Sequence, residues 1–289
     1  MDANNELALR FEEHRSHLKA VAYRMLGSLS EADDAVQEGW LRLSRTDTSD
    51  VENLGGWLTT VVGRVCLDML RSRERREEPV GERLPDPIVA GDQPGDPERE
   101  AMLADSVGLA MLVVLDTLAP AERLAFVLHD MFAVPFEEIA PIVERAPSAT
   151  RQLASRARRR VQGVTPVPDS DLSRQRKVVD AFLAAARGGD FQALVAVLDP
   201  SVVQRAAALG RLTVLRGAAA VAEQAMTFAR VASGAHPVLI NGAAGVVAAT
   251  PDGRPFSLLA FTIVDERIVE MYAFVGPELV EEFAGQSWK

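Results

Sequence analysis

The chain has 289 residues, of which 48% are hydrophobic and 25% charged, and its formal net charge is −10. This composition excludes a disordered or fibrous chain and allows two or three small globular domains. The N-terminus lacks a signal pattern, and no apolar run approaches the roughly 18 residues that a membrane helix needs. We therefore expect a cytoplasmic protein that does not engage a membrane.

The negative net charge argues against nucleic-acid binding, because phosphate contacts need cations. The basic residues are clustered, however. Six arginines fall between Arg145 and Arg160 with no acid among them, and a second group comprises Arg71, Arg73, Arg75 and Arg76. The sequence therefore predicts local basic patches on an acidic body.

The first predicted elements are helices. Asn53 is a candidate cap for a helix whose apolar stripe runs from Leu54 to Met69. Another face of that helix carries Arg64, Asp68 and Arg71 at i, i+4 and i+7. A solvated charged face explains this pattern as well as a binding surface does.

The single cysteine, Cys66, lies in the same stretch among apolar neighbours. We interpret it as a core residue rather than a redox switch. With one cysteine and no ligand spacing in the chain, we expect neither a metal site nor a cofactor.

A proline-rich segment follows, with five prolines between residues 79 and 97. Such a segment cannot sustain a helix or a central strand, so it is predicted to be a linker. A second break follows residue 163. The predicted division is helical domains at 1–78 and 99–163, linkers at 79–98 and 164–172, and a third domain at 173–289.

The second helical block contains the strongest local pattern. A short amphipathic helix over 136–143, a turn over 144–147 and a basic helix capped by Ser148 are the parts of a helix-turn-helix. In the basic helix, Leu153, Ala157 and Val161 are predicted to face inward. The opposite stripe is suited to reading base edges in the major groove, because arginine and glutamine make bidentate contacts there. Its members are Arg151, Gln152, Ser155, Arg158 and Arg159.

The third block begins with helical patterns over 174–187 and 191–198 and continues with strand-like runs up to residue 275. Helices followed by a meander of strands predict an α+β cone with a curved antiparallel sheet.

The stretches VAYRMLGSLSEADDAVQEGWLRL (21–43) and NLGGWLTTVVGRVCLDMLRSRERR (53–76) resemble region 2 of extracytoplasmic-function sigma factors. The run LAPAERLAFVLHDMFAVPFEEIAPIVERAPSATRQLASRARRRV (118–161) resembles their region 4. The third block resembles the SnoaL-like domain fused to one group of these factors. That group carries a linker signature that Leu84, Pro85, Asp86 and Pro87 match.

The resemblance implies a promoter-recognising subunit whose partners are promoter DNA and core RNA polymerase, through the beta-prime coiled coil and the beta flap. It implies core binding by Asp34, Gln37, Glu38 and Trp40. It implies −10 binding by the loop before Asn53 and by Arg64, Asp68 and Arg71, and −35 reading by the stripe on the basic helix. The linker signature would pack between domains, and the SnoaL-like domain would regulate the factor in cis and is a candidate for binding an unknown small ligand.

Two alternatives remain. A single-site helix-turn-helix regulator explains the second block but leaves the first without a task. An enzyme would need an ionisable group in the cone, for which His236, Asp199 and Glu223 are the candidates. We expect no catalytic residues and no enzymatic activity.

Overall fold

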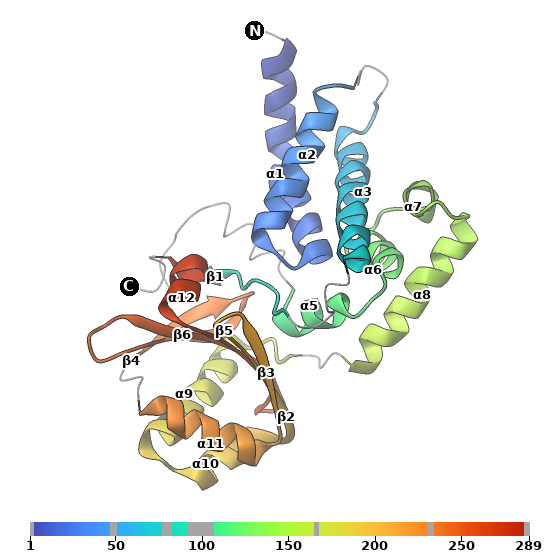
Figure 1. Cartoon of the computed structure of the whole chain (residues 1–289). Coiled ribbons are helices and arrows are strands. Elements are labelled where there is room, and N and C mark those ends of the chain that lie inside the picture. The colour runs from blue at the N-terminus through green and yellow to red at the C-terminus, as the bar shows by residue number, and fades with distance from the viewer. Residues whose placement is uncertain are drawn as a thin grey trace. The chain divides into compact units, whose positions relative to one another are not determined.

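The computed structural model describes residues 3–46, 51–76, 83–91, 107–164, 168–230 and 234–285 (Figure 1). The chain forms two compact units, and we treat each by itself. The helical unit comprises Met1–Gly81 and Met111–Thr165, and the C-terminal unit comprises Glu82–Ala110 and Pro166–Lys289. Both predicted classes, all-α and α+β, are therefore present.

The first part of the helical unit is a three-helix bundle of α1 (Ala3–Leu26), α2 (Leu29–Leu43) and α3 (Leu54–Arg75). Asn53 caps α3 as predicted, because its side chain accepts a hydrogen bond from the backbone N–H of Gly56 at 3.0 Å. Gly39 permits close packing of α2 on α3, since a Cβ there would lie 2.9 Å from Val62 Cγ2.

The second part contains α5 (Leu109–Asp116), α6 (Pro120–Phe126), a π-helical turn η1 (Val127–Met131), α7 (Phe136–Val143) and α8 (Pro147–Val164). Helices α7 and α8 confirm the predicted helix-turn-helix. Two details differ. Helix α8 begins at Pro147, ahead of Ser148, because proline is favoured at a first helical position. Its buried face includes Thr150, Ala154, Ala157 and Val161, while Leu153 is only half-buried.

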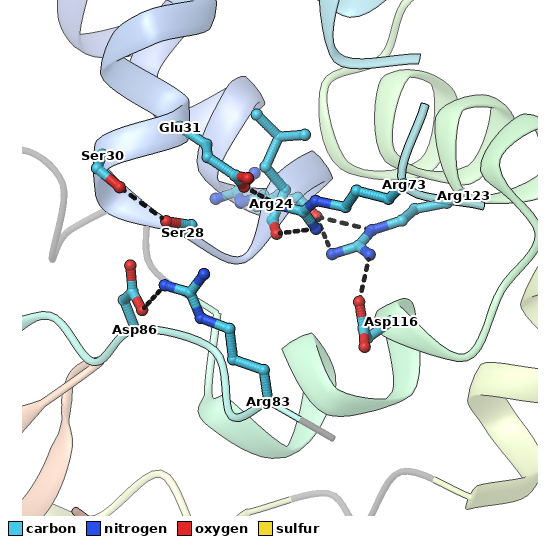
Figure 2. A network of polar contacts seen from close by, with 10 residues as sticks. Arg24, Ser28, Ser30, Glu31, Arg73, Arg83, Asp86, Asp116 and Arg123 are labelled. Carbon is cyan, nitrogen blue, oxygen red and sulfur yellow. Dashed lines mark hydrogen bonds and ion pairs between the residues drawn. The ribbon is translucent and has the colours of Figure 1, made fainter. Parts of the chain in front are cut away.

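The two parts of the helical unit pack on each other. Gly63 of α3 faces Leu124 and Leu128, and a Cβ there would lie 3.4 and 3.2 Å from their Cδ1 atoms. Arg123 of α6 is buried, with its side chain 2% exposed, and its guanidinium donates to the carbonyl oxygen of Arg24 in α1 (Figure 2). Its Nη1 also donates to Asp116 Oδ1 at 3.1 Å. A buried charge with several partners therefore joins the two parts.

The C-terminal unit is a seven-stranded sheet in the order β1-β4-β5-β6-β7-β2-β3, with α9, α10 and α11 on one face (Figure 1). Its strands are β1 (Val89–Ala90), β2 (Leu198–Ala208), β3 (Arg211–Arg216), β4 (Gly234–Ile240), β5 (Ala243–Ala249), β6 (Pro255–Val264) and β7 (Arg267–Val275). Its helices are α9 (Leu172–Gly188), α10 (Phe191–Val197), α11 (Ala218–Ala229) and α12 (Pro277–Ala284).

The sheet is mixed rather than wholly antiparallel. Neighbours that follow each other along the chain pair antiparallel, through two-residue turns except between β5 and β6, which residues 250–254 join. Strand β2 instead runs parallel to β7, because the intervening chain carries it across the sheet. At the β4–β5 hairpin, Asn241 and Gly242 both have positive φ, as a type I′ turn requires. This turn divides a run that the sequence pattern alone left as one strand-like segment.

The proline-rich segment is not a free linker over its described part, 83–91. Val89 and Ala90 form the edge strand β1, paired with Ile240 and Leu239 of β4. Pro85 and Pro87 precede the paired residues, which is how an edge strand accommodates proline. The described part of the chain that connects the two parts of the helical unit therefore contributes a short strand to the C-terminal sheet.

Candidate nucleic-acid interface

The predicted base-reading stripe lies on the exposed side of α8. Arg151, Gln152 and Arg159 are exposed, and Ser155 and Arg158 are half-buried. The guanidinium of Arg151 lies over the ring of Phe136, 5.2 Å from its centroid, so its position is held by a cation–π contact from α7. The five side chains thus share a stripe, as the helical spacing predicted.

Arg158 has an acidic partner that the sequence pattern did not predict. Its Nη2 lies 2.6 Å from Oδ1 of Asp130, which stands on the π-helical turn η1. To contact a base, the guanidinium of Arg158 has to leave Asp130 and bind the base edge instead. Asp130 is far from Arg158 in the sequence, so no local spacing indicates the pairing.

The basic end of α8 has a second acidic neighbour. Glu122 of α6 lies 3.6 Å from Arg156 and 3.7 Å from Arg160. These arginines face away from the predicted stripe. They therefore help to hold α8 on α6, whereas Arg151 and Arg159 of the stripe are exposed to solvent.

The second predicted surface lies on α3. Arg64 and Asp68 are exposed and Arg71 is half-buried, so the three share a side of the helix as expected. Arg64 lies 3.7 Å from Glu144, the left-handed residue that ends α7. Within the described residues, Asp68 and Arg71 have no ion-pair partner. Part of the loop before Asn53, residues 47–50, lies outside the described residues.

The predicted polymerase-binding residues lie on α2. Asp34 and Gln37 are exposed, and Leu41 on the same side is an exposed apolar side chain at 38%. Glu38 accepts a hydrogen bond from Arg42 at 2.9 Å. Trp40 differs from the others, because its ring packs against Phe11 of α1 at a centroid distance of 5.2 Å and contributes to the bundle.

The linker residues Leu84, Pro85, Asp86 and Pro87 are buried. Arg83 donates to Asp86 Oδ1 at 3.2 Å (Figure 2). Just beyond them, the backbone N–H of Ile88 donates to Asn241 Oδ1 at 3.0 Å, and the N–H of Asn241 donates back to the carbonyl of Ile88 at 2.9 Å.

Asn241 also reaches the far end of the same segment. Its Nδ2 donates to the carbonyl oxygen of Val107 at 3.0 Å, just before α5. A single side chain thus binds both ends of the segment between residues 88 and 107. Sequence reasoning did not single out Asn241, although an Asn-Gly pair between apolar runs is a known hairpin signal.

The C-terminal unit holds a cavity between its sheet and helices α9 and α11. Its described lining includes none of the candidate enzymatic groups. His236 and Glu223 are exposed, and a hydrogen bond from Ser201 lowers the pKa of Asp199, away from the value a general base needs near neutral pH.

Among the described helices, none has both the length and the apolar character needed to cross a lipid bilayer.

Two family models match the chain: Sigma-70 region 2 over residues 10–76, and Sigma-70, region 4 over residues 109–161. The first contains the α2 and α3 surfaces and the second contains the helix-turn-helix.

The chain is 44% identical over 194 residues to the ECF RNA polymerase sigma factor SigJ of Mycobacterium tuberculosis (strain ATCC 25618 / H37Rv), covering 66% of this chain and 62% of that relative. It is 31% identical over 297 residues to the "Probable ECF RNA polymerase sigma factor SigI" of the same strain, covering 97% of both chains. The crystal structure of the M. tuberculosis extracytoplasmic function sigma factor SigJ matches with a TM-score of 0.75 and 32% identity, covering 98% of this chain and 100% of that one. The chain therefore belongs to the ECF sigma factors of RNA polymerase, in the form that carries a C-terminal SnoaL-like domain.

Proposed function

We propose that this ECF sigma factor brings core RNA polymerase to promoters through two separate DNA-binding surfaces, and that its C-terminal domain restrains it in cis. The observation that carries this proposal is the pair of cationic faces, on α8 and α3, in the two matched sigma regions. As a polymerase subunit it acts in the cytoplasm.

The α8 stripe reads the duplex −35 element. Arg151 and Arg159 are exposed cations of the kind that pair with guanine, and Gln152 between them suits adenine. Arg158 joins them once Asp130 releases it. The stripe lies on a rigid helix, which holds the contacts at the regular spacing that base reading requires.

The α3 face binds the opened −10 element, together with the chain around Asn53. Arg64 and Arg71 supply backbone cations, and Asp68 between them accepts hydrogen bonds from base edges. Replacing these residues should impair promoter opening more than binding to a −35 duplex fragment.

The α2 face docks on the beta-prime coiled coil of core polymerase, and region 4 docks on the beta flap. Asp34 and Gln37 surround the exposed Leu41 with polar groups. An apolar centre with a polar rim is the usual composition of a protein interface. Trp40 is half-buried, so its ring can pack against Phe11 and also present an edge to the polymerase.

Within the helical unit, the α3 and α7 elements touch, as the Arg64–Glu144 pair shows. Elements centred at −35 and −10 are separated by about 25 base pairs, or roughly 85 Å of B-form duplex. Touching domains cannot reach both at once, so the packed helical unit is the resting state and the two regions must separate on the promoter.

The C-terminal domain controls this separation through the connecting segment. Because β1 and Asn241 bind residues 88–90 and Val107 to the C-terminal unit, both ends of the segment are fixed there. Detaching the connecting segment from the sheet lengthens the tether between the two sigma regions. The longer tether favours the arrangement in which the two regions are apart. The buried 84–87 signature adds to this hold.

Asn241→Gly in the full chain tests the restraint. Glycine tolerates the positive φ of this turn but removes the side-chain bonds to Ile88 and Val107, which together contribute about 1 to 3 kcal/mol. We expect more run-off transcript with purified core polymerase. Leu209→Gly is the control, because Leu209 also has positive φ in a two-residue hairpin but is 96% exposed. Equal transcript from wild type and Asn241→Gly would contradict the restraint.

A further inference from the structure

The SnoaL-like domain is hollow. A cavity, part of which is open to solvent, lies between the inner face of the sheet and helices α9 and α11. A largely apolar concave site with a few polar groups is the usual form of a small-molecule site. The cavity lies wholly within the C-terminal unit.

The cavity exists because many side chains that face it are small. The alanines in its lining are Ala186, Ala206, Ala225, Ala229, Ala235, Ala248 and Ala273. Larger apolar side chains, among them Phe182, Leu259 and Met271, complete the wall. Such a surface gains free energy by excluding water, so it favours an apolar occupant.

Gln204 interrupts this apolar wall. It lies on β2, where its Cα pairs with those of Leu215 on β3 and Met271 on β7, and only 3% of the residue is exposed. Its Oε1 has no hydrogen-bond partner among the described residues. A buried amide in this condition costs free energy, and such a group in a cavity wall is an anchor for a ligand's polar atom.

The charge of the residues that line the cavity further restricts the class of ligand that can bind. Arg187 is the charged residue in the described lining, and it is exposed at the rim rather than buried inside. An ion deep in the cavity would lack a counter-charge, so the occupant is neutral.

We propose that this cavity binds a neutral, largely apolar molecule that carries a hydroxyl group, and that the hydroxyl hydrogen-bonds to the side-chain amide of Gln204. A hydroxyl both donates and accepts, which suits an amide that presents an oxygen and a nitrogen. His236, Asp199 and Glu223 are outside the lining, so the cavity binds rather than transforms its ligand.

A ligand in this cavity can also affect how the C-terminal domain holds the segment that connects the two sigma regions. Gly234 and Ala235 of β4 line the cavity, and β4 is also the strand that pairs with β1. Occupancy can therefore bias the strand that holds the connecting segment. This regulatory meaning rests on the proposed function, whereas binding itself does not.

The test uses a matched pair of probes, 2-naphthol and 2-methylnaphthalene, which differ in the hydroxyl. Each is titrated into the full-length protein, without polymerase or DNA, and followed by probe fluorescence. Three variants accompany the wild type. Gln204→Leu removes the anchor, Ala225→Phe fills the cavity, and Gln192→Leu repeats the first change at an exposed position on α10.

We expect the wild type to bind 2-naphthol more tightly than 2-methylnaphthalene. Gln204→Leu should raise the Kd of 2-naphthol by about 3- to 10-fold and leave that of 2-methylnaphthalene unchanged or lower. Ala225→Phe should weaken both probes, and Gln192→Leu neither. Circular dichroism spectra matching the wild type establish that each variant is folded.

Absence of binding by the wild type, or an equal effect of Gln204→Leu on both probes, would overturn the proposal. Because no transcription is measured, these outcomes are independent of the Asn241→Gly test.

Discussion

The helical unit and the SnoaL-like domain each contain a deeply buried polar side chain, Arg123 in the first and Gln204 in the second, and the surroundings of the two differ. Arg123 is surrounded by partners, with its guanidinium bonded to the carbonyl of Arg24 and to Asp116. Gln204 is as deeply buried, but its Oε1 has no partner within the described structure and faces a cavity. The polar atoms of Arg123 are therefore satisfied inside a packed core, whereas the Oε1 of Gln204 is left unsatisfied beside a cavity.

This difference matches where each unit carries out its function. The helical unit surrounds its buried Arg123 with partners, and we propose that it binds DNA through cations on the surfaces of α8 and α3. The C-terminal domain has a hollow interior, and its inferred binding group points inward. Removing the Arg123 side chain should therefore lower the free energy of unfolding, whereas replacing the Gln204 amide should raise it and weaken ligand binding.

The largest expected effect is at Arg123. Arg123→Ala leaves the carboxylate of Asp116 and the carbonyl of Arg24 without their partner, so the free energy of unfolding should fall by about 3 to 5 kcal/mol. Urea denaturation followed by circular dichroism measures it. Arg156→Ala is the control, since it breaks an exposed ion pair worth less than about 1 kcal/mol. Similar losses in the two variants would contradict the claim that the buried Arg123 contributes more to stability than an exposed arginine.

The next effect is on the surface of α8. Arg151→Ala should weaken binding to a −35 duplex by about 1 to 3 kcal/mol and relax specificity at one base pair, while the free energy of unfolding changes by less than about 0.5 kcal/mol. Fluorescence anisotropy with matched and mismatched duplexes measures both affinities. Arg216→Ala removes an exposed arginine from β3 as a charge control. Unchanged discrimination in Arg151→Ala would show that this arginine does not read the element.

Gln204→Leu should have the opposite sign to Arg123→Ala. Replacing an unpartnered buried amide by an apolar side chain of similar size should raise the free energy of unfolding of the ligand-free protein by about 1 kcal/mol. Thermal unfolding compares it with Gln192→Leu. A lower stability would mean that the amide is satisfied in the folded protein.

The smallest effect concerns Cys66 in the sealed core. Burial raises the pKa of its thiol to about 12 from the usual 9.0. The folded-state pKa is the higher one, so the contribution of the thiol to stability is complete well below pH 9. It begins to fall near pH 9 and is lost progressively up to pH 12, because over this range the unfolded chain alone loses the proton. The loss at pH 9 is about 0.4 kcal/mol. The pH dependence of urea unfolding should therefore be shallower in Cys66→Ala than in the wild type, and identical slopes would argue against a sealed thiol.

Local periodicity predicted the elements whose residues lie close in the sequence. The helix-turn-helix, the Asn53 cap and the shared faces of α3 and α8 all follow from helical spacing and capping chemistry. The inward register of α8 was partly wrong, because Ala154 rather than Leu153 is fully buried. Alanine gives a weak periodic signal, and the packing of α6 against α8 decides which side is covered.

Long-range partners were not predictable in this way. Whether Val89 and Ala90 form a strand depends on β4, about 150 residues later. Asp130 and Glu144 hold arginines from other helices, and Gln204 is distinctive because of what surrounds it in the fold. Helices α11 and α12 were also missed, since their short apolar sequences resemble the strands beside them.

The most direct test of the account is a DNase footprint of a promoter with the full-length protein, with and without core polymerase. We expect the holoenzyme to protect both the −35 and the −10 elements, since we propose that α8 and α3 engage them together after the helical unit opens. Protection of a single element, unchanged by core polymerase, would contradict it and identify a one-site regulator instead.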